Sequence, residues 1–154
     1  MRYAAAVASG IVFATSLSLP ALAIEASLTA TSASTPDAVW AKIGDFCGIA
    51  NWGLGLKCVM SADGTTRTLT TPDGAVVVEQ LESRDDKAHT YSYAITNPGP
   101  LPVANYHSKI AVTPSGSGSS ITWSGMFDAK GAPAAEVKKI FDGLYKAGVD
   151  NLAK

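Results

Sequence analysis

Polar and apolar residues alternate along most of the chain between residues 24 and 129, and this period of two predicts β-strands. Short turn sequences, such as Asp63-Gly64 and the triplet at residues 72–74, separate the alternating runs and favour hairpins. The predicted strands cover residues 24–32, 56–62, 65–71, 75–84, 88–96, 103–113 and 119–129. The strands from residue 56 onward, joined by short turns, predict an antiparallel sheet that the first strand completes.

A helical period replaces this alternation in two parts of the chain. After the first strand, Ser34 or Thr35 can cap a helix that has Pro36 at its first position, and residues 47–52 (CGIANW) then predict a second short helix. Residues 133–152 predict one long helix, whose apolar face consists of Val137, Ile140, Phe141, Leu144, Gly148 and Leu152. A long amphipathic helix laid across a curved antiparallel sheet buries both apolar faces. We therefore predict an α+β fold with two short helices after the first strand.

The first residues have the order of a secretory signal peptide. Arg2 precedes an uncharged, apolar-rich run over residues 3–19, and Ala21-Leu22-Ala23 provides an A-x-A cleavage site. The alternative is a membrane anchor, but the run is short and contains Ser and Thr, which disfavours a spanning helix. We therefore predict a signal peptide at residues 1–23 and a single domain at residues 24–154, periplasmic or secreted and without membrane contact after cleavage.

The composition suits one globular domain, with 47% hydrophobic and 16% charged residues and a formal net charge of −1. The sequence has no basic patch or stripe, which excludes nucleic acid as an expected partner. Cys47 and Cys58 lie eleven positions apart, and in an oxidising compartment this favours a disulfide over a free, reactive thiol. Neither a C-x-x-C pair nor a nearby His accompanies them, so we expect no metal site.

Two segments resemble those of a known superfamily. The motif SASTPDAVWAKIGDF and the later pattern VEQLESRDDKAHTYSYAI…LPVANYHSKIAV are similar to START-like or Bet v 1-like proteins, and more closely to bacterial SRPBCC proteins labelled polyketide cyclase/dehydrase. The resemblance covers residues 24–154. It implies a helix-grip fold, in which a seven-stranded sheet wraps around the C-terminal helix and encloses a cavity for an apolar or amphipathic small molecule. It also implies that Glu79, Tyr106 and Ser108 hold a ligand's polar end and that Tyr93 lines the cavity.

Strand alternation independently places aromatic and polar side chains on the inner face of the sheet. These candidate ligand-binding residues are Glu79, Tyr91, Tyr93, Tyr106, Ser108, Trp123 and Phe127. Trp52, beside a glycine-rich loop, is expected at the edge of the cavity. Three roles remain open for Glu79: a structural network with tyrosines, a hydrogen bond to a ligand, or a general base with a raised pKa. No G-x-S-x-G, H-E-x-x-H or phosphate-loop motif occurs, so we assign no catalytic residue and no cofactor.

Prolines occupy alternate positions in the connection between two of the predicted strands, at Pro98, Pro100 and Pro102. Because proline has no N–H to donate, this segment stays out of the sheet ladder. We expect Leu101 to lie at the mouth of the cavity and to face the turn at residues 72–74. The alternative is a rigid surface connection without a gating role.

Three hypotheses about function follow. The first is an exported protein that binds a hydrophobic or amphipathic small molecule between the sheet and the C-terminal helix. The second is a cyclase or dehydratase-type enzyme that uses Glu79 with Tyr93 or Tyr106. The third is an accessory protein for a periplasmic dehydrogenase or cytochrome, because exported members of the family resemble the periplasmic accessory protein of bacterial methanol oxidation.

Overall fold

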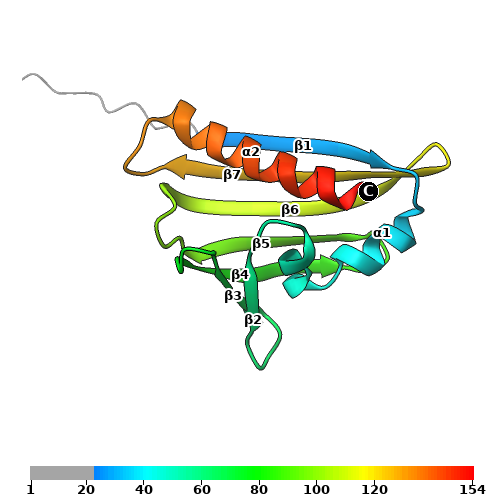
Figure 1. Ribbon diagram of the computed structural model, residues 1–154, viewed down its shortest axis with the longest axis horizontal. Coiled ribbons are helices and arrows are strands. Elements are labelled where there is room, and N and C mark those ends of the chain that lie inside the picture. Colours follow the sequence, from blue (N-terminus) through cyan, green and yellow to red (C-terminus); the bar gives the residue numbers. More distant parts are fainter. Residues whose placement is uncertain (1–22) are drawn as a thin grey trace, which may run out of the picture.

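The computed structural model describes residues 23–154 (Figure 1). The predicted signal peptide lies, apart from Ala23, outside the described residues. Within residues 23–154, no helix combines the length and the apolar character needed to cross a membrane.

Seven antiparallel strands form one sheet in the order β1-β7-β6-β5-β4-β3-β2, so that β1 and β2 are its two edges (Figure 1). The strands are β1 (Ile24–Ser32), β2 (Lys57–Met60), β3 (Thr66–Thr70), β4 (Val76–Asp85), β5 (Thr90–Asn97), β6 (Val103–Ser115) and β7 (Gly118–Ala129). From β2 to β7 each strand pairs with the next one along the chain, and β1 closes the sheet against β7. The predicted antiparallel sheet is confirmed, and β2 is shorter than the sequence pattern indicated.

Two short helices, α1 (Pro36–Ile43) and the 3-10 helix η1 (Phe46–Asn51), connect β1 to β2 as predicted. The Thr35 hydroxyl accepts a hydrogen bond from the Ala38 N–H at 3.4 Å, and Pro36 occupies the first turn, so the expected start signals of α1 are present. The Asp45 carboxylate caps η1 by accepting from the Cys47 N–H at 3.0 Å.

The inner face of the sheet is the alternating set that the sequence predicts. Along β5, and along β7 from Ser119 to Phe127, the buried residues occupy every second position, and their neighbours are exposed or half-buried. β6 departs from strict alternation, because Val103 and Tyr106 are both buried although they are three residues apart. The cause is a bulge between Ala104 and His107, where Asn105 has a positive φ of 50°. The bulge inserts one extra residue, so that the Tyr106 side chain faces inward again.

The long C-terminal helix α2 (Ala134–Leu152) packs against the inner face, mainly over β1 and β7 (Figure 1). Its buried residues are Val137, Phe141, Tyr145, Gly148, Val149 and Leu152. The prediction that Ile140 belongs to the buried face is wrong, because this side chain is 47% exposed. The face of α2 that packs on the sheet is centred on Phe141, Tyr145 and Gly148. Ile140 lies outside this face.

Gly148 allows α2 to approach the sheet closely. A Cβ atom at this position would lie 2.5 Å from Cζ3 of Trp123, well inside van der Waals contact. The Trp123 ring is in turn stacked on the Tyr145 ring, with centroids 4.5 Å apart and an angle of 17° between the planes. Because both rings are buried, neither can move aside without disturbing the core.

Gly148→Ala is expected to lower the free energy of unfolding by about 1–3 kcal/mol, because overpacking Trp123 outweighs the better helix propensity of alanine. Gly143 on the same helix is the matched control, since a Cβ there meets nothing within 4 Å. Gly143→Ala should therefore raise the free energy of unfolding by about 0.5–1 kcal/mol. Urea unfolding of both variants measures these changes. If both substitutions changed the free energy of unfolding in the same direction, the close packing of α2 on Trp123 would be contradicted.

Candidate functional site

A cavity of about 130 Å³ lies between the inner face of the sheet, the segment that follows α1, and α2. Most of its lining is aliphatic or aromatic. Leu54 and Leu56 come from the connection between η1 and β2, Leu101 comes from the loop between β5 and β6, and Phe141 and Leu144 come from α2. The cavity is therefore mainly apolar with a few polar side chains, a composition typical of ligand sites.

Five side chains with polar atoms belong to this lining, namely Thr71, Glu79, Tyr93, Tyr106 and Trp123. Thr71 bonds to its own turn, where its hydroxyl donates to Asp73 and to the Ala75 carbonyl. The other four residues belong to neighbouring strands β4, β5, β6 and β7, so they lie together on the inner face. Glu79 and Tyr93 are diagonal neighbours, since Glu79 pairs with Ile95 and Tyr93 pairs with Leu81.

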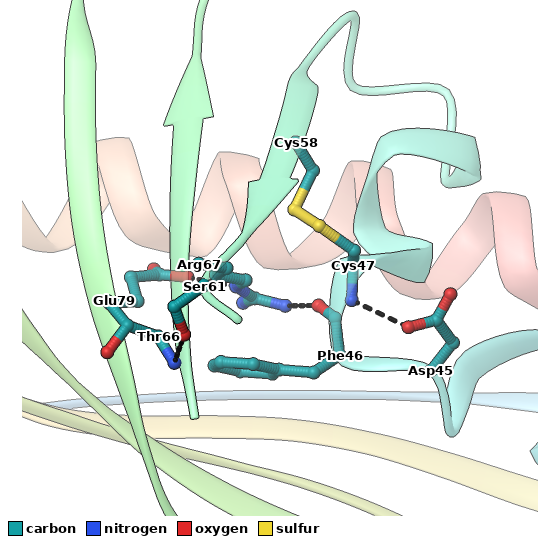
Figure 2. Close-up of a disulfide and its surroundings, with 8 residues drawn as sticks. All are labelled: Asp45, Phe46, Cys47, Cys58, Ser61, Thr66, Arg67 and Glu79. Carbon is teal, nitrogen blue, oxygen red and sulfur yellow. Dashed lines mark hydrogen bonds and ion pairs between the residues drawn. A yellow bond between two sulfur atoms is a disulfide. The ribbon is translucent and has the colours of Figure 1, made fainter. Parts of the chain in front are cut away.

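Glu79 is held by an arginine that lies behind the cavity wall. Arg67 is the direct cross-strand partner of Glu79, is 0% exposed, and donates from Nε to Oε2 of Glu79 at 2.5 Å. Its Nη1 donates to the Phe46 carbonyl (Figure 2), and its guanidinium lies over two rings, with Cζ 4.0 Å from the Phe46 centroid and 4.7 Å from the Tyr93 centroid. Nη2 has no hydrogen-bond partner among the described residues.

The Arg67–Glu79 pair is ionic. Burial lowers the pKa of Arg67, but the negative charge of Glu79 outweighs this effect and leaves the pKa raised. Burial raises the pKa of Glu79 above its ordinary value, and the charge and hydrogen bond of Arg67 offset only part of that rise. A neutral Glu79 would leave a buried guanidinium without its paired counter-charge, which costs several kcal/mol, so the charged form of both groups is favoured.

A hydroxyl network crosses from the sheet to α2 beside the cavity. The Tyr106 and Tyr145 hydroxyls lie 2.5 Å apart, and the Ser108 hydroxyl donates to the Ser124 carbonyl at 2.7 Å. The Trp123 indole N–H donates to the Ser108 hydroxyl at 2.9 Å and to the Tyr93 hydroxyl at 3.1 Å. These bonds fix the orientation of the rings that line the cavity.

The tyrosines of this network keep their protons at neutral pH. Burial raises the pKa of Tyr145 to about 12, although the hydrogen bond with Ser108 opposes the rise. Burial also raises the pKa of Tyr93 and Tyr106 well above the usual value for tyrosine. All three hydroxyls are therefore available as donors rather than as phenolate bases.

The structure divides the predicted site residues into two groups. Five of them line the cavity: Glu79, Tyr93, Leu101, Tyr106 and Trp123. The others surround it without lining it. Ser108 supports Trp123, Tyr91 packs against Phe46, Phe127 stacks on Tyr106, and Trp52 meets Trp123 edge to face.

The proline segment between β5 and β6 lies against the beginning of β4. A Cβ atom on Gly99, whose φ is 56°, would lie 2.1 Å from the Val76 carbonyl oxygen, so only glycine permits this approach. The contact places the segment against the first residues of β4, Val76 and Val77. Leu101 is half-buried and lines the cavity. Its place at the mouth, facing the turn at residues 72–74, stays a prediction.

The disulfide between Cys47 and Cys58 closes a loop that covers the cavity. Three residues within this loop, Ile49, Leu54 and Leu56, belong to the cavity lining. Figure 2 shows that Cys47 directly follows Phe46, whose carbonyl accepts from Arg67. The predicted bridge is confirmed, and it ties the cover of the cavity to the strand next to the ion pair. A disulfide is typical of proteins in oxidising, extracytoplasmic compartments.

Sequence reasoning missed two residues of this region, Arg67 and Tyr145. A signal for each was present. Arg67 alternates with Leu69, so it lies on the inner face of β3, and Tyr145 follows Phe141 by one helical turn. Both were passed over because an arginine and a tyrosine are compatible with an exposed surface as well.

A second hollow, an open groove of about 470 Å³, crosses the outer face of the sheet. Its side chains include Glu25, Glu82, His107 and Lys109, which belong to the polar face. The His107 ring lies 2.8 Å from Glu82 in an exposed pair. None of the inward-facing aromatic residues lines this groove, so the inner cavity is the candidate functional site.

Comparisons with known proteins agree with this architecture. Residues 23–154 match the family described as polyketide cyclase/dehydrase and lipid transport. The structure of the protein XoxI from Bacillus cereus is 32% identical in sequence, covers 84% of this chain and 92% of its own, and superposes with a TM-score of 0.80. No curated protein matches the sequence.

Two more distant structures share the fold. The ZhuI aromatase/cyclase from a Streptomyces species is 13% identical, covers 85% of this chain and 92% of its own, and has a TM-score of 0.70. Truncated norcoclaurine synthase from Thalictrum flavum is 20% identical, covers 90% of this chain and 96% of its own, and has a TM-score of 0.66. Together with the family match over residues 23–154, the 32% identity to XoxI shows that the chain belongs to the polyketide cyclase/dehydrase family of the SRPBCC, or Bet v 1-like, superfamily.

Proposed function

We propose that this protein is an exported small-molecule-binding protein, and that it holds an apolar or amphipathic ligand in the cavity between the sheet and α2. The observation that carries the proposal is the cavity itself. It measures about 130 Å³, is lined mainly by aliphatic and aromatic side chains, and has most of its polar side chains on the neighbouring strands β4 to β7. Proteins of this family bind hydrophobic small molecules, and the family description includes lipid transport.

An enzyme of the cyclase or dehydratase type is the second candidate, because Glu79 and Tyr93 line the same cavity. The ion pair argues against this role. A general base must accept a proton, but Arg67 stabilises the charged carboxylate by a direct hydrogen bond of 2.5 Å. Binding therefore accounts for the site more simply than catalysis. No contact or surface feature of residues 23–154 favours the accessory role beside a dehydrogenase over ligand binding.

Export is supported by the sequence of the first residues and by the Cys47–Cys58 disulfide. Intact-mass measurement of the protein recovered from the periplasm or the medium tests it. The expected mass is that of a chain that begins at Ile24.

Ligand binding is expected to raise the melting temperature and to be lost when the cavity is filled. A ligand present at 100 times its Kd stabilises the folded state by about 2.7 kcal/mol. Leu144 lines the cavity, so Leu144→Trp should weaken binding at least tenfold, because the larger ring occupies the ligand's space. A thermal-shift panel of lipids, aromatic compounds and isoprenoids, with native mass spectrometry of protein purified without detergent, provides the measurement.

Ile140→Trp is the matched control on the same helix. Ile140 is exposed and does not line the cavity, so this variant should bind as the wild type does. A flat melting temperature across the whole panel, with no copurified ligand, would contradict the proposed function. Equal binding by the Leu144→Trp and wild-type proteins would place the ligand outside this cavity.

A further inference from the structure

The aromatic rings between the sheet and α2 set the size of the cavity. Phe141 and Tyr106 line it, and their ring centroids lie 5.2 Å apart. Phe127 lies behind both rings, outside the lining, with its centroid 4.5 Å from that of Phe141 and 5.6 Å from that of Tyr106. All three side chains are at most 3% exposed. The cavity therefore cannot extend in this direction without displacing close-packed rings.

A second aromatic wall limits the cavity where Trp123 lines it. Tyr145 stacks on Trp123 with ring centroids 4.5 Å apart, and Trp52 meets the same ring edge to face at 5.3 Å. The Tyr145 hydroxyl reaches the backbone of β7, since a Cβ atom on Gly125 would lie 2.2 Å from it. Gly148 likewise brings α2 into contact with Trp123, so helix and sheet are closely packed on this side of the cavity.

These walls leave a volume of about 130 Å³ for a ligand. An engineered apolar cavity of roughly 150 Å³ in another protein binds benzene, whereas pockets for drug-sized ligands measure roughly 300–1,000 Å³. The volume is therefore that of one ring with small substituents. A long acyl chain or a fused-ring polyketide, although the family description includes lipids and polyketides, needs more space than this.

Phe141 is the lining residue whose ring most directly limits this volume. Its ring separates the cavity from Phe127. Removing the Phe141 ring therefore adds its space to the cavity and makes Phe127 the new wall. The neighbouring lining residues Tyr106 and Trp123 are also held by hydrogen bonds of their own, so their positions do not depend on Phe141 alone.

We propose that the cavity accepts an apolar molecule no larger than a single substituted ring, that it excludes long acyl chains and fused rings, and that Phe141 sets this limit; this inference rests on the proposed ligand-binding function. Its basis is the volume between the two aromatic walls. Because a closely packed core resists overpacking, a larger molecule gains nothing from the atoms that do not fit.

NMR titration of the amide resonances with three probes, toluene, naphthalene and palmitate, tests the proposal. The wild-type protein should bind toluene, and it should bind naphthalene at least about tenfold more weakly although naphthalene is the more hydrophobic, because a second ring overpacks the cavity. Palmitate should not bind. Phe141→Ala should bind naphthalene at least as tightly as toluene. Phe141→Leu should shift the preference in the same direction by a smaller factor, and it keeps the test valid if the alanine variant does not fold.

Val149→Ala is the matched control, because Val149 is buried on the same helix but lies outside the cavity lining. This variant should keep the wild-type preference for toluene. Tighter binding of naphthalene or palmitate than of toluene by the wild type would overturn the inference and leave the proposed binding function standing. An unchanged preference for toluene in both Phe141 variants would overturn the role of Phe141. If none of the three probes binds, both the inference and the proposed function fail.

Discussion

Replacing Arg67 by methionine is expected to lower the free energy of unfolding by about 3–5 kcal/mol, the largest single-residue effect that this structure predicts. The substitution preserves most of the apolar volume but leaves the Glu79 carboxylate buried without its counter-ion. It also removes the donor to the Phe46 carbonyl and the cation–π contacts with the rings of Phe46 and Tyr93. Urea unfolding at neutral pH measures the loss.

The double substitution Arg67→Met/Glu79→Leu should recover most of this stability, because well-packed apolar residues often replace a buried ion pair at little cost. Lys138→Met is the control for the loss of a surface cation. Lys138 pairs with Asp142 one turn away on α2, in an exposed contact of 2.7 Å, so its removal should cost no more than about 0.5 kcal/mol. If Arg67→Met behaves like Lys138→Met, the buried pair is not ionic.

Removing the disulfide by the double substitution Cys47→Ser/Cys58→Ser is expected to lower the free energy of unfolding by about 3 kcal/mol. The bridge joins residues separated by eleven positions, and the figure follows from the entropy that such a loop closure removes from the unfolded chain. The closed loop carries three residues of the cavity lining, Ile49, Leu54 and Leu56. Faster ligand exchange should therefore accompany the loss of stability, because the cover of the cavity is less restrained.

Reduction of the wild-type protein provides the matched control for the disulfide. Dithiothreitol should lower the stability of the wild type toward that of the double variant and should leave the variant unchanged. The loop keeps a second attachment, since the Asn151 amide donates to the Trp52 carbonyl at 3.0 Å, so we expect the variant to remain folded. A variant as stable as the oxidised wild type would show that the bridge does not restrain the unfolded chain.

The elements of this fold were predictable because each depends on neighbours in the sequence. Thr35 and Pro36 start α1 through local hydrogen bonding and a preset φ angle. The alternation in β5 and β7 reflects the period of the strand itself. The error at Ile140 is of a different kind, because a helix with apolar residues on a broad face does not reveal which part of that face meets the sheet.

The candidate site was predictable only in part. Alternation brought Glu79, Tyr93 and Tyr106 to the inner face, and the structure places all three on the cavity. It could not separate them from Tyr91 and Phe127, which share that face but lie in the surrounding packing. The packing of α2 and of the loop after η1 against the sheet decides which inward-facing side chains line the cavity. A local sequence pattern contains no information about that packing.

The sequence by itself determined the order of the strands and helices and the inner face of the sheet, and it favoured the pairing of the two cysteines, since these follow from short-range periodicity, capping and composition. Only the tertiary structure decided that Arg67 neutralises Glu79 and that Tyr145 engages the hydroxyl of Tyr106. The physical reason is distance along the chain. The first contact depends on the register of two strands, and the second joins residues 39 positions apart on different elements. The cavity depends in the same way on the packing of segments that are distant in the sequence, because its lining comes from the sheet, the loop after η1 and α2.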